Sequence, residues 1–246
     1  MRARLLVAVA GLLVAAFVGS GFVIVPGPRQ TRECKGLNAC YGVSGLWVVV
    51  PAHGQATYLL GCPLRSKENG LFLLGGTDSR VSSSHVHVWY EGKLGAPIGR
   101  QAPGKPSSGL LFHASTDDGR QGSFQPVVGC ISLKQALKRS TLSATAAGPP
   151  VGRGRLGPPQ PTYRTQSVAL EPGWTRTIAA ACPRHESLVG GWSALAFGTA
   201  GPPIAYREGS VTLQNSRVGR AARTVVHTAA SVPYLIHVQV GAMCER

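Results

Sequence analysis

The sequence predicts an all-β protein, with two tandem disulfide-stapled antiparallel β-sandwich domains after an N-terminal signal or anchor segment. Three observations lead to this prediction: the glycine and proline content, the spacing of six cysteines and an internal repeat. The 32 glycines and 18 prolines disfavour long helices and are typical of short strands joined by turns. With 43% hydrophobic and 14% charged residues, the chain has the composition of a folded protein rather than a disordered one.

The first 25 residues are predicted to be a targeting segment. Arg2 and Arg4 precede residues 5–25, which carry no charge. In one interpretation, residues 5–18 are the apolar core of a signal peptide that is cleaved near Ser20. In the other, residues 5–25 remain as a membrane anchor that is long enough to span a bilayer. In both interpretations the rest of the chain is extracytoplasmic, because the two arginines favour the cytoplasmic side.

The six cysteines are predicted to form disulfides, because an even number of cysteines in an exported chain is typical of a disulfide framework. Two of them are close in sequence, and the other four form two pairs with long and similar separations. The predicted bridges are Cys34–Cys40, Cys62–Cys130 and Cys182–Cys244. No CxxC motif is present, so neither a zinc knuckle nor a thioredoxin-type centre is supported, and no cofactor is expected.

An internal repeat surrounds the four widely spaced cysteines. The first half contains VVVPAHGQATYLLGCP followed by LFLLGGTDS, and the second contains VALEPGWTRTIAAACP followed by SLVGGWSAL. Each copy closes on a strand that ends in cysteine, FQPVVGC or LIHVQVGAMC. The repeat predicts one β-sandwich over residues 31–144 and another over residues 163–246, joined by a linker rich in Pro, Gly and Arg at residues 145–162.

The alternation of apolar residues predicts where the long disulfides lie. In the second copy, one strand face carries Ile178, Ala180 and Cys182, and the last strand presents Tyr234, Ile236, Val238, Val240, Ala242 and Cys244 on one face. Each long bridge should therefore cross the core of a sandwich. The pairs Gly75-Gly76 and Gly190-Gly191 are expected to be β-bulges or points of close packing.

The order Cys-Pro, apolar run, Gly-Gly and strand-final Cys resembles repeats of uncharacterised exported proteins from GC-rich, actinobacterial-type bacteria. The resemblance covers nearly all of the chain after the targeting segment. It implies a scaffold of tandem β-sandwiches and carries over no activity. The first copy departs from the second by a longer gap between Cys-Pro and Gly-Gly, and by the additional pair Cys34 and Cys40.

The formal charge of +15 favours anionic partners. The expected partner is an anionic envelope polymer, a glycan or another surface protein, and an uncleaved segment 5–25 would add the membrane. Arg217, Arg220 and Arg223 in RVGRAAR are the candidate anion-binding site. The alternative is a solvated basic loop without a dedicated partner. No RRM, helix-turn-helix or OB signature is present, so specific nucleic-acid binding is not expected.

His85 and His87 are the candidate metal ligands, since residues two apart on a strand share a face. A third ligand is needed, and His113 or Asp78 is the candidate. The alternative is two histidines that face solvent. The neighbouring motif Asp117-Asp118-Gly119 offers paired carboxylates but is also an ordinary turn signature, which is the preferred interpretation.

Aromatic residues could stack on sugar rings or pack in the core. The candidates are Trp89, Trp174, Trp192, Tyr90 and Tyr206. Core packing is the preferred interpretation, as the positions of Trp174 after a turn and Trp192 after Gly-Gly illustrate. No GxSxG or SxxK motif is present. The expected function is therefore a non-enzymatic envelope- or surface-associated binding or structural protein. The alternative is an exported metal-binding protein or hydrolase that uses the His85/His87 face.

Overall fold

The computed structural model describes residues 23–24, 32–34, 40–63, 72–91, 109–117, 119–132, 161–203, 210–233 and 235–245. These residues form 14 strands and one short 3-10 helix, so the predicted all-β class is confirmed. Most of the predicted targeting segment lies outside the described residues. Within the described part, no helix is long and apolar enough to cross a membrane.

The strands of the first half are β1 (Val23–Ile24), β2 (Cys40–Ser44), β3 (Trp47–Val50), β4 (Gln55–Gly61), β5 (Phe72–Val81), β6 (Val86–Glu91), β7 (Gly109–Thr116) and β8 (Gly122–Ser132). The first half also contains the 3-10 helix η1 (Arg32–Cys34), which contacts β2, β5 and β8. The strands of the second half are β9 (Thr162–Leu170), β10 (Thr175–Ala181), β11 (Ser187–Phe197), β12 (Val211–Val218), β13 (Ala221–Thr228) and β14 (Ile236–Glu245).

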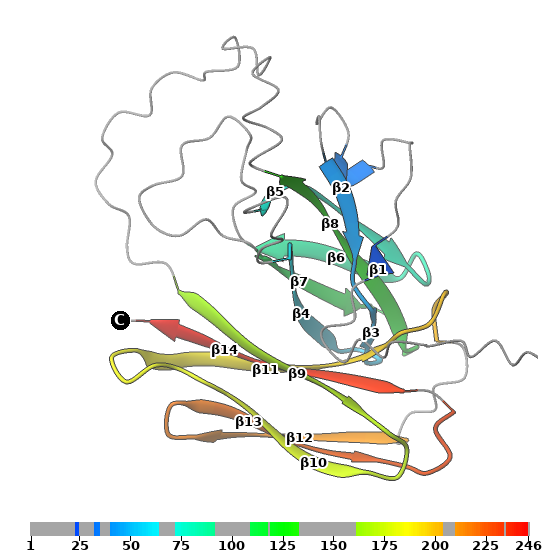
Figure 1. Ribbon diagram of the computed structural model, residues 1–246. Helices are drawn as coiled ribbons and strands as arrows, with labels where there is room; N and C mark the ends of the chain where they lie inside the picture. Colours follow the sequence, from blue (N-terminus) through cyan, green and yellow to red (C-terminus); the bar gives the residue numbers. More distant parts are fainter. Residues whose placement is uncertain are drawn as a thin grey trace, which may run out of the picture.

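The strands form three antiparallel sheets (Figure 1). The largest has eight strands in the order β1-β2-β8-β3-β11-β14-β9, with β5 paired to β8 as a branch. The other two have three strands each, in the orders β4-β7-β6 and β10-β13-β12. In Figure 1 the layer β10-β13-β12 lies below β9-β14-β11, and the strands of the first half lie above both.

The two halves have similar patterns of strand pairing. In the first half β8 pairs with β5 and with β2 and β3, while β7 pairs with β4 and β6. In the second half β14 pairs with β11 and β9, while β13 pairs with β10 and β12. The division into domains at residues 144 and 163 stays a prediction, because residues 133–160 lie outside the described part. Thr162, predicted to be in the linker, is the first residue of β9.

The two Gly-Gly pairs lie beside β-bulges, as expected from the sequence. The register shifts between Leu74 and Gly76 in β5, and between Leu188 and Gly190 in β11. In the first half the glycines also allow a close approach. A Cβ atom at Gly76 or at Gly129 would collide with the backbone carbonyl group of Glu33 in η1. The Cys34–Cys40 disulfide closes η1 against β2 at this point.

Two hydrophobic cores are present, and a long disulfide lies in each. Cys62–Cys130 joins the end of β4 to β8 in the first core, and Cys182–Cys244 joins the end of β10 to β14 in the second. Together with Cys34–Cys40, the structure therefore has the three disulfide pairs that the sequence predicts. The second core includes the alternate residues Ile236, Val238, Val240 and Ala242 of β14, as their parity requires.

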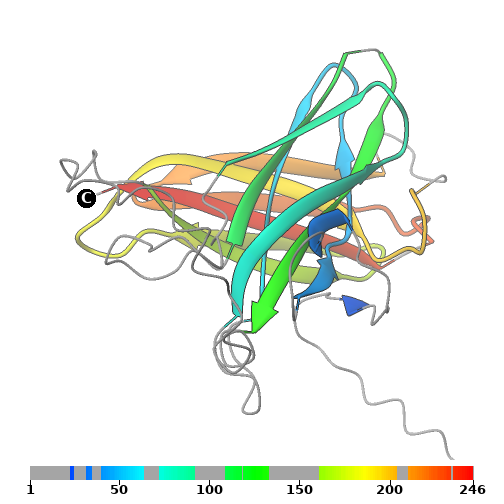
Figure 2. The same cartoon turned by 90° about the horizontal axis from the view of Figure 1, so that it is seen from above.

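Strands β3 and β11 form a wall between the two cores. Their antiparallel pairing joins Trp47 to Phe197 and Val48 to Ala196. Alternate side chains enter different cores. The first core contains Val48, Val50, Ala194 and Ala196, and the second contains Val49, Leu195 and Phe197. The two halves therefore share one continuous sheet, whereas the repeat predicts two separate sandwiches. Seen from above, the strands of the first half run across those of the second (Figure 2).

Gln239 joins the two halves at a second point. Its side chain is only 5% exposed, although it lies on the face of β14 that points away from the second core. The backbone N–H of Leu59 donates to Gln239 Oε1 (2.7 Å), and Gln239 Nε2 donates to the carbonyl oxygen of Leu59 (3.0 Å). One side-chain amide thus satisfies both backbone groups of Leu59 on the free edge of β4.

We expect removal of the Cys182–Cys244 bridge to be more destabilising than removal of Cys34–Cys40. The two bridges close segments with sequence separations of 62 and 6 residues. In the chain-entropy model these correspond to about 4 and about 2 kcal/mol of unfolding free energy. Denaturant unfolding of the two double Cys→Ala variants measures the difference, and equal losses would contradict it.

Gln239→Ala should lower the free energy of unfolding by about 1–3 kcal/mol, because it leaves two backbone groups of Leu59 without a partner. Gln214→Ala, at an exposed position of β12, is the matched control and should have little effect. Urea denaturation of both variants provides the measurement. The contact at Leu59 is structurally unimportant if the two variants are equally stable.

His237 lies two residues before Gln239 on β14, and burial lowers its pKa below the ordinary value of 6.5. The unfolded chain therefore binds a proton more readily than the folded one as the pH falls through about 6.5. We expect the loss of stability between about pH 7.5 and about pH 5.5 to be smaller in His237→Gln than in the wild type. Thermal unfolding at several pH values tests this, and parallel profiles would contradict it.

Candidate functional site

The candidate anion-binding arginines lie at the tip of the β12–β13 hairpin. Val218 pairs with Ala221, so Gly219 and Arg220 form a two-residue turn. Gly219 has φ +58°, the conformation that a type II′ turn requires at its first central position. Arg217 and Arg223 flank the turn and are exposed. Strand alternation places them on opposite faces of the hairpin, since Arg217 pairs with Ala222 and Arg223 pairs with Ser216.

Arg220 is held by the chain beside the disulfide. Its guanidinium Nη1 donates a hydrogen bond to the carbonyl oxygen of Arg184. Its own carbonyl oxygen accepts a hydrogen bond from the backbone N–H of Cys182 (2.9 Å). The hairpin tip is therefore fixed to the turn that follows β10. The three predicted arginines lie at one end of the second half but do not converge on one point.

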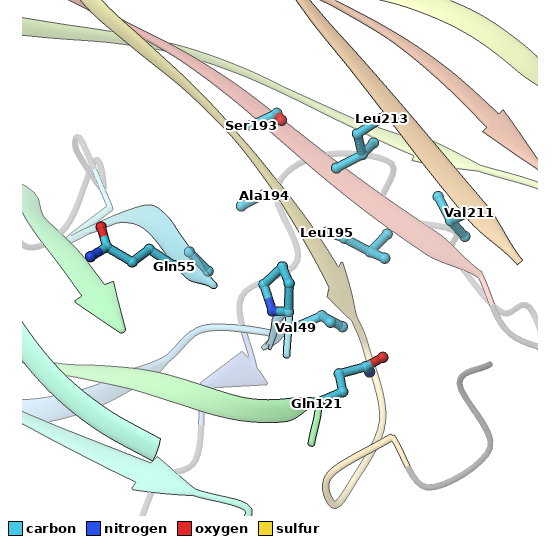
Figure 3. Close-up of a pocket in the computed structure, with 10 residues that line it drawn as sticks. Val49, Gln55, Gln121, Ser193, Ala194, Leu195, Val211 and Leu213 are labelled. Carbon is cyan, nitrogen blue, oxygen red and sulfur yellow. The ribbon is translucent and has the colours of Figure 1, made fainter. Parts of the chain in front are cut away.

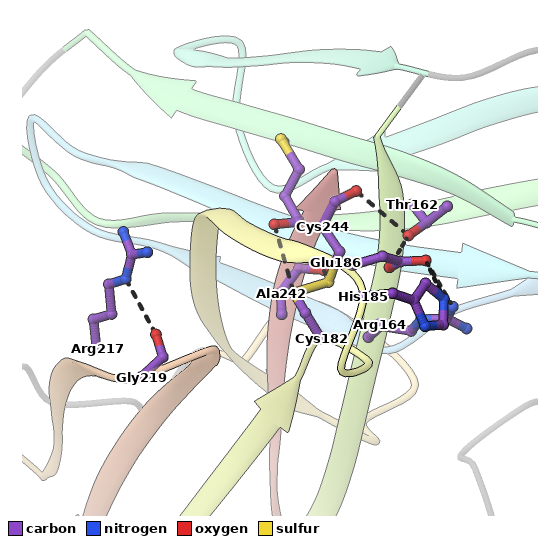
Figure 4. The surroundings of a disulfide bond; sticks show 10 residues. Thr162, Arg164, Cys182, His185, Glu186, Arg217, Gly219, Ala242 and Cys244 are labelled. Carbon is purple, nitrogen blue, oxygen red and sulfur yellow. Dashed lines mark hydrogen bonds and ion pairs between the residues drawn. A yellow bond between two sulfur atoms is a disulfide. The ribbon is translucent and has the colours of Figure 1, made fainter. Parts of the chain in front are cut away.

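The same end carries further ionisable residues, and one of them is buried. Glu186 is 5% exposed, and its carboxylate accepts a hydrogen bond from the Thr162 hydroxyl (2.9 Å). Arg164 lies 3.8 Å and His185 3.9 Å from the Glu186 carboxylate, and these groups gather around it in Figure 4. Arg217 lies apart and donates through Nε to the carbonyl oxygen of Gly219 (3.4 Å).

We call this region the arginine end and define it by Arg164, Arg184, Arg217, Arg220 and Arg223. The described carboxylates at this end are Glu186, which is buried, and Glu245, which is exposed. Neither Arg217 nor Arg223 forms an ion pair with a described carboxylate. The arginine end therefore presents an excess of exposed positive charge.

A groove of about 290 Å³ lies between β11 and β12 beside the arginine end, and its lining includes Trp192, Arg217 and Arg223. Asn215 lines this groove and connects neighbouring strands through hydrogen bonds. The Asn215 Oδ1 atom accepts hydrogen bonds from the hydroxyl groups of Ser193 (2.8 Å) and Thr224 (2.9 Å). These bonds link β11, β12 and β13.

A second hollow of about 230 Å³ lies where the two halves meet (Figure 3). Its lining is mainly apolar, including Val49, Leu195 and Leu213, with polar groups from Gln55 and Gln121. No ionisable side chain lines this hollow among the described residues. It therefore lacks the acid, base or charge that catalysis or ion binding would use.

The candidate metal ligands differ from the expected geometry. His85 lies in the turn before β6, so it does not share a strand face with His87. His87 Nε2 instead contacts the carboxylate of Asp117 at 2.6 Å. Asp78 lies in β5 opposite Val127. Among the described residues, no three His, Cys, Asp or Glu side chains are grouped to hold a metal. The metal interpretation stays a prediction.

His113 lies on the same sheet face as His87 but has other partners. Its ring stacks on Trp89, with centroids 5.5 Å apart and planes 17° apart. Its Nδ1 lies 3.0 Å from the Thr57 hydroxyl, and its Nε2 lies 3.7 Å from the Glu91 carboxylate. Asp117 occupies the bend after β7, as the turn interpretation of this motif expects, and Asp118 lies outside the described residues.

The aromatic candidates divide into packed and exposed rings. Trp192 packs over Gly241 and meets Tyr163 edge to face at 6.1 Å. Burial, and then the negative charge of Glu91, raise the pKa of Tyr163. Trp174 is 45% exposed, so the expectation that it packs in the core is wrong. It occupies the turn before β10. Tyr206 lies outside the described residues.

The fold and these surfaces define a class of protein: an all-β, disulfide-bonded chain with two cores and an exposed cluster of arginines. Comparison with protein-family models, with curated proteins and with solved structures found no match. The function of this chain is therefore inferred from its own geometry.

Sequence reasoning missed two features of these surfaces. The first is the place of Arg184 in the arginine end. The signal for it is the order Cys-Pro-Arg, because the predicted bridge at Cys182 fixes the turn that contains Arg184. The contact between Trp89 and His113 was also missed. It depends on the pairing of β6 with β7, and the 17 residues between Glu91 and Gly109 give no local signal for that register.

Proposed function

We propose that this chain is an exported, non-enzymatic binding protein of the cell envelope or surface, and that its arginine end contacts an anionic polymer. In this proposal residues 1–25 direct export, as a cleaved signal or an anchor, and a duplicated β-sandwich supplies both halves. Three disulfides support an oxidising, extracytoplasmic location. The resemblance to repeats of exported actinobacterial-type proteins agrees with this proposal and adds no activity.

The main observation behind the proposal is that neither Arg217 nor Arg223 forms an ion pair with a described carboxylate. Arginine binds phosphate and carboxylate through charge-assisted hydrogen bonds, and these strengthen where no internal carboxylate competes. The hairpin that bears both residues is fixed by the contacts of Arg220. Binding would thus not require the hairpin backbone to become ordered.

The spacing of the arginines favours a polymer over a small anion. Arg217 and Arg223 project from opposite faces of the hairpin, and Arg184 lies on a different turn. A chain with repeated negative charges would contact several of them in sequence and release counterions from each contact.

The rival function is an exported metal-binding protein or hydrolase. The contact between His87 and Asp117 favours it, because a histidine beside a carboxylate can act in proton transfer or metal binding. However, both side chains are more than half exposed, and His85 lies in the preceding turn instead of beside them. The arginine end is therefore the better supported site.

The test is co-sedimentation of the purified protein with isolated envelope material, together with gel-shift binding to dextran sulfate and to neutral dextran. Wild-type protein should bind the envelope and dextran sulfate but not dextran. Binding should weaken steeply between about 0.05 M and about 0.5 M salt, because exposed charges are screened. Arg217→Gln/Arg223→Gln should weaken binding by about tenfold or more, from the loss of two charged contacts.

The matched control is Arg80→Gln/Arg176→Gln, which removes the same charge from exposed strand positions elsewhere. It should retain most of the wild-type affinity. Equal weakening in both double variants would show that only net charge matters and would contradict a specific arginine end. Absence of binding to the envelope and to dextran sulfate at low salt would contradict the proposed function.

A further inference from the structure

The outward face of the β4-β7-β6 sheet carries a polar row that the arginine end does not use. Register places Thr57 of β4, His113 of β7 and Trp89 of β6 side by side across the three strands. The opposite face of these strands, with Tyr58, Phe112 and Ala114, packs in the first core. Core packing therefore fixes the backbone beneath Thr57, His113 and Trp89.

Trp89 is held on this face by His113, its partner across the ladder. Its ring is nearly parallel to that of His113, with an interplanar angle of 17° and centroids 5.5 Å apart. The Thr57 hydroxyl holds His113 at Nδ1 (3.0 Å). Trp89 is nevertheless 42% exposed. One face of the indole is supported by a positioned imidazole. Trp89 lies on β6, the edge strand of the β4-β7-β6 sheet, so a ligand can reach the exposed part of the ring.

Hydrogen-bonding groups lie at both ends of this ring. His87 and Glu91 are two residues from Trp89 on the same strand face, which places each about 7 Å away along β6. His87 is held by Asp117 at 2.6 Å, and Glu91 lies 3.7 Å from His113. Both carboxylates are more than half exposed, so their free oxygen lone pairs can accept hydrogen bonds from a ligand.

We propose that Trp89, with His87, Asp117 and Glu91 around it, forms a binding platform for a neutral, hydroxyl-rich glycan. A pyranose ring presents a flat apolar C–H face that fits the indole, and a rim of hydroxyl groups that fits carboxylate and imidazole partners. The inference extends the proposed binding role of the protein, but it uses a different surface from the arginine end.

The charge of the platform decides which glycan class fits. Asp117 and Glu91 are carboxylates, and the described residues of the platform contain no lysine or arginine. Uronate, sulfate or phosphate groups would be repelled there, whereas neutral hydroxyl groups would donate to the carboxylates. The platform and the arginine end therefore select opposite chemistries on one molecule.

The test is isothermal titration of the purified full chain with neutral hexasaccharides of glucose, N-acetylglucosamine, mannose and galactose. At least one should bind at concentrations up to about 5 mM, with an affinity unchanged between about 0.05 M and about 0.5 M salt. Trp89→Ala should weaken that binding by about tenfold or more, and Trp89→Phe should retain part of it. Thermal unfolding of each variant checks that the fold is intact.

Trp174→Ala is the matched control, because Trp174 is 45% exposed and lies in the second half. It should bind the hexasaccharide as tightly as the wild type does. The platform proposal is overturned if no hexasaccharide binds, or if Trp89→Ala and Trp174→Ala weaken binding equally. If the wild-type protein binds a hexasaccharide but not dextran sulfate, only the proposal for the arginine end is overturned. The two proposals can therefore fail independently.

Discussion

The packing of β3 against β11 is the interaction on which the rest of this structure depends. The pair is buried on both sides, with alternate residues in each core. A strand with two buried faces has no position that tolerates a charged side chain without loss of packing on one side. Each core is therefore completed by residues of the other half, and we expect the two halves to unfold together.

The two halves differ in the polar surfaces that they bear. In the second half, the end near Cys182–Cys244 gathers arginines around a rigid hairpin. In the first half, the outward sheet face gathers an indole, two histidines and carboxylates. A similar strand order supports both surfaces, because alternate residues of each strand pack in a core while the others face outward. In the proposals made for these surfaces, one scaffold presents an arginine-rich site for anions and a carboxylate-rich site for neutral glycans.

Much of this fold follows from local patterns, and the remainder depends on partners distant in sequence. Strand alternation around Cys182 and Cys244, together with the cysteine spacing, is sufficient to predict strands and the long disulfides, but not the arrangement of the sheets. The continuous apolar runs WVVV and ALAF were a signal for strands buried on both faces, but neither identified the other as its partner. His85 was expected on a strand, and the turn at Ser83–Val86 excluded it. Arginine spacing in sequence did not reveal that alternation separates Arg217 from Arg223.

Gln239 has a consequence for how molecules of this protein meet one another. An edge strand with free N–H and C=O groups is a template on which a strand from a neighbouring molecule can add. The side-chain amide of Gln239 occupies these groups at Leu59, near the middle of β4. The cap comes from the same chain, so it is present at any protein concentration. Crowding on a surface would therefore not extend this sheet from one molecule to the next through β4.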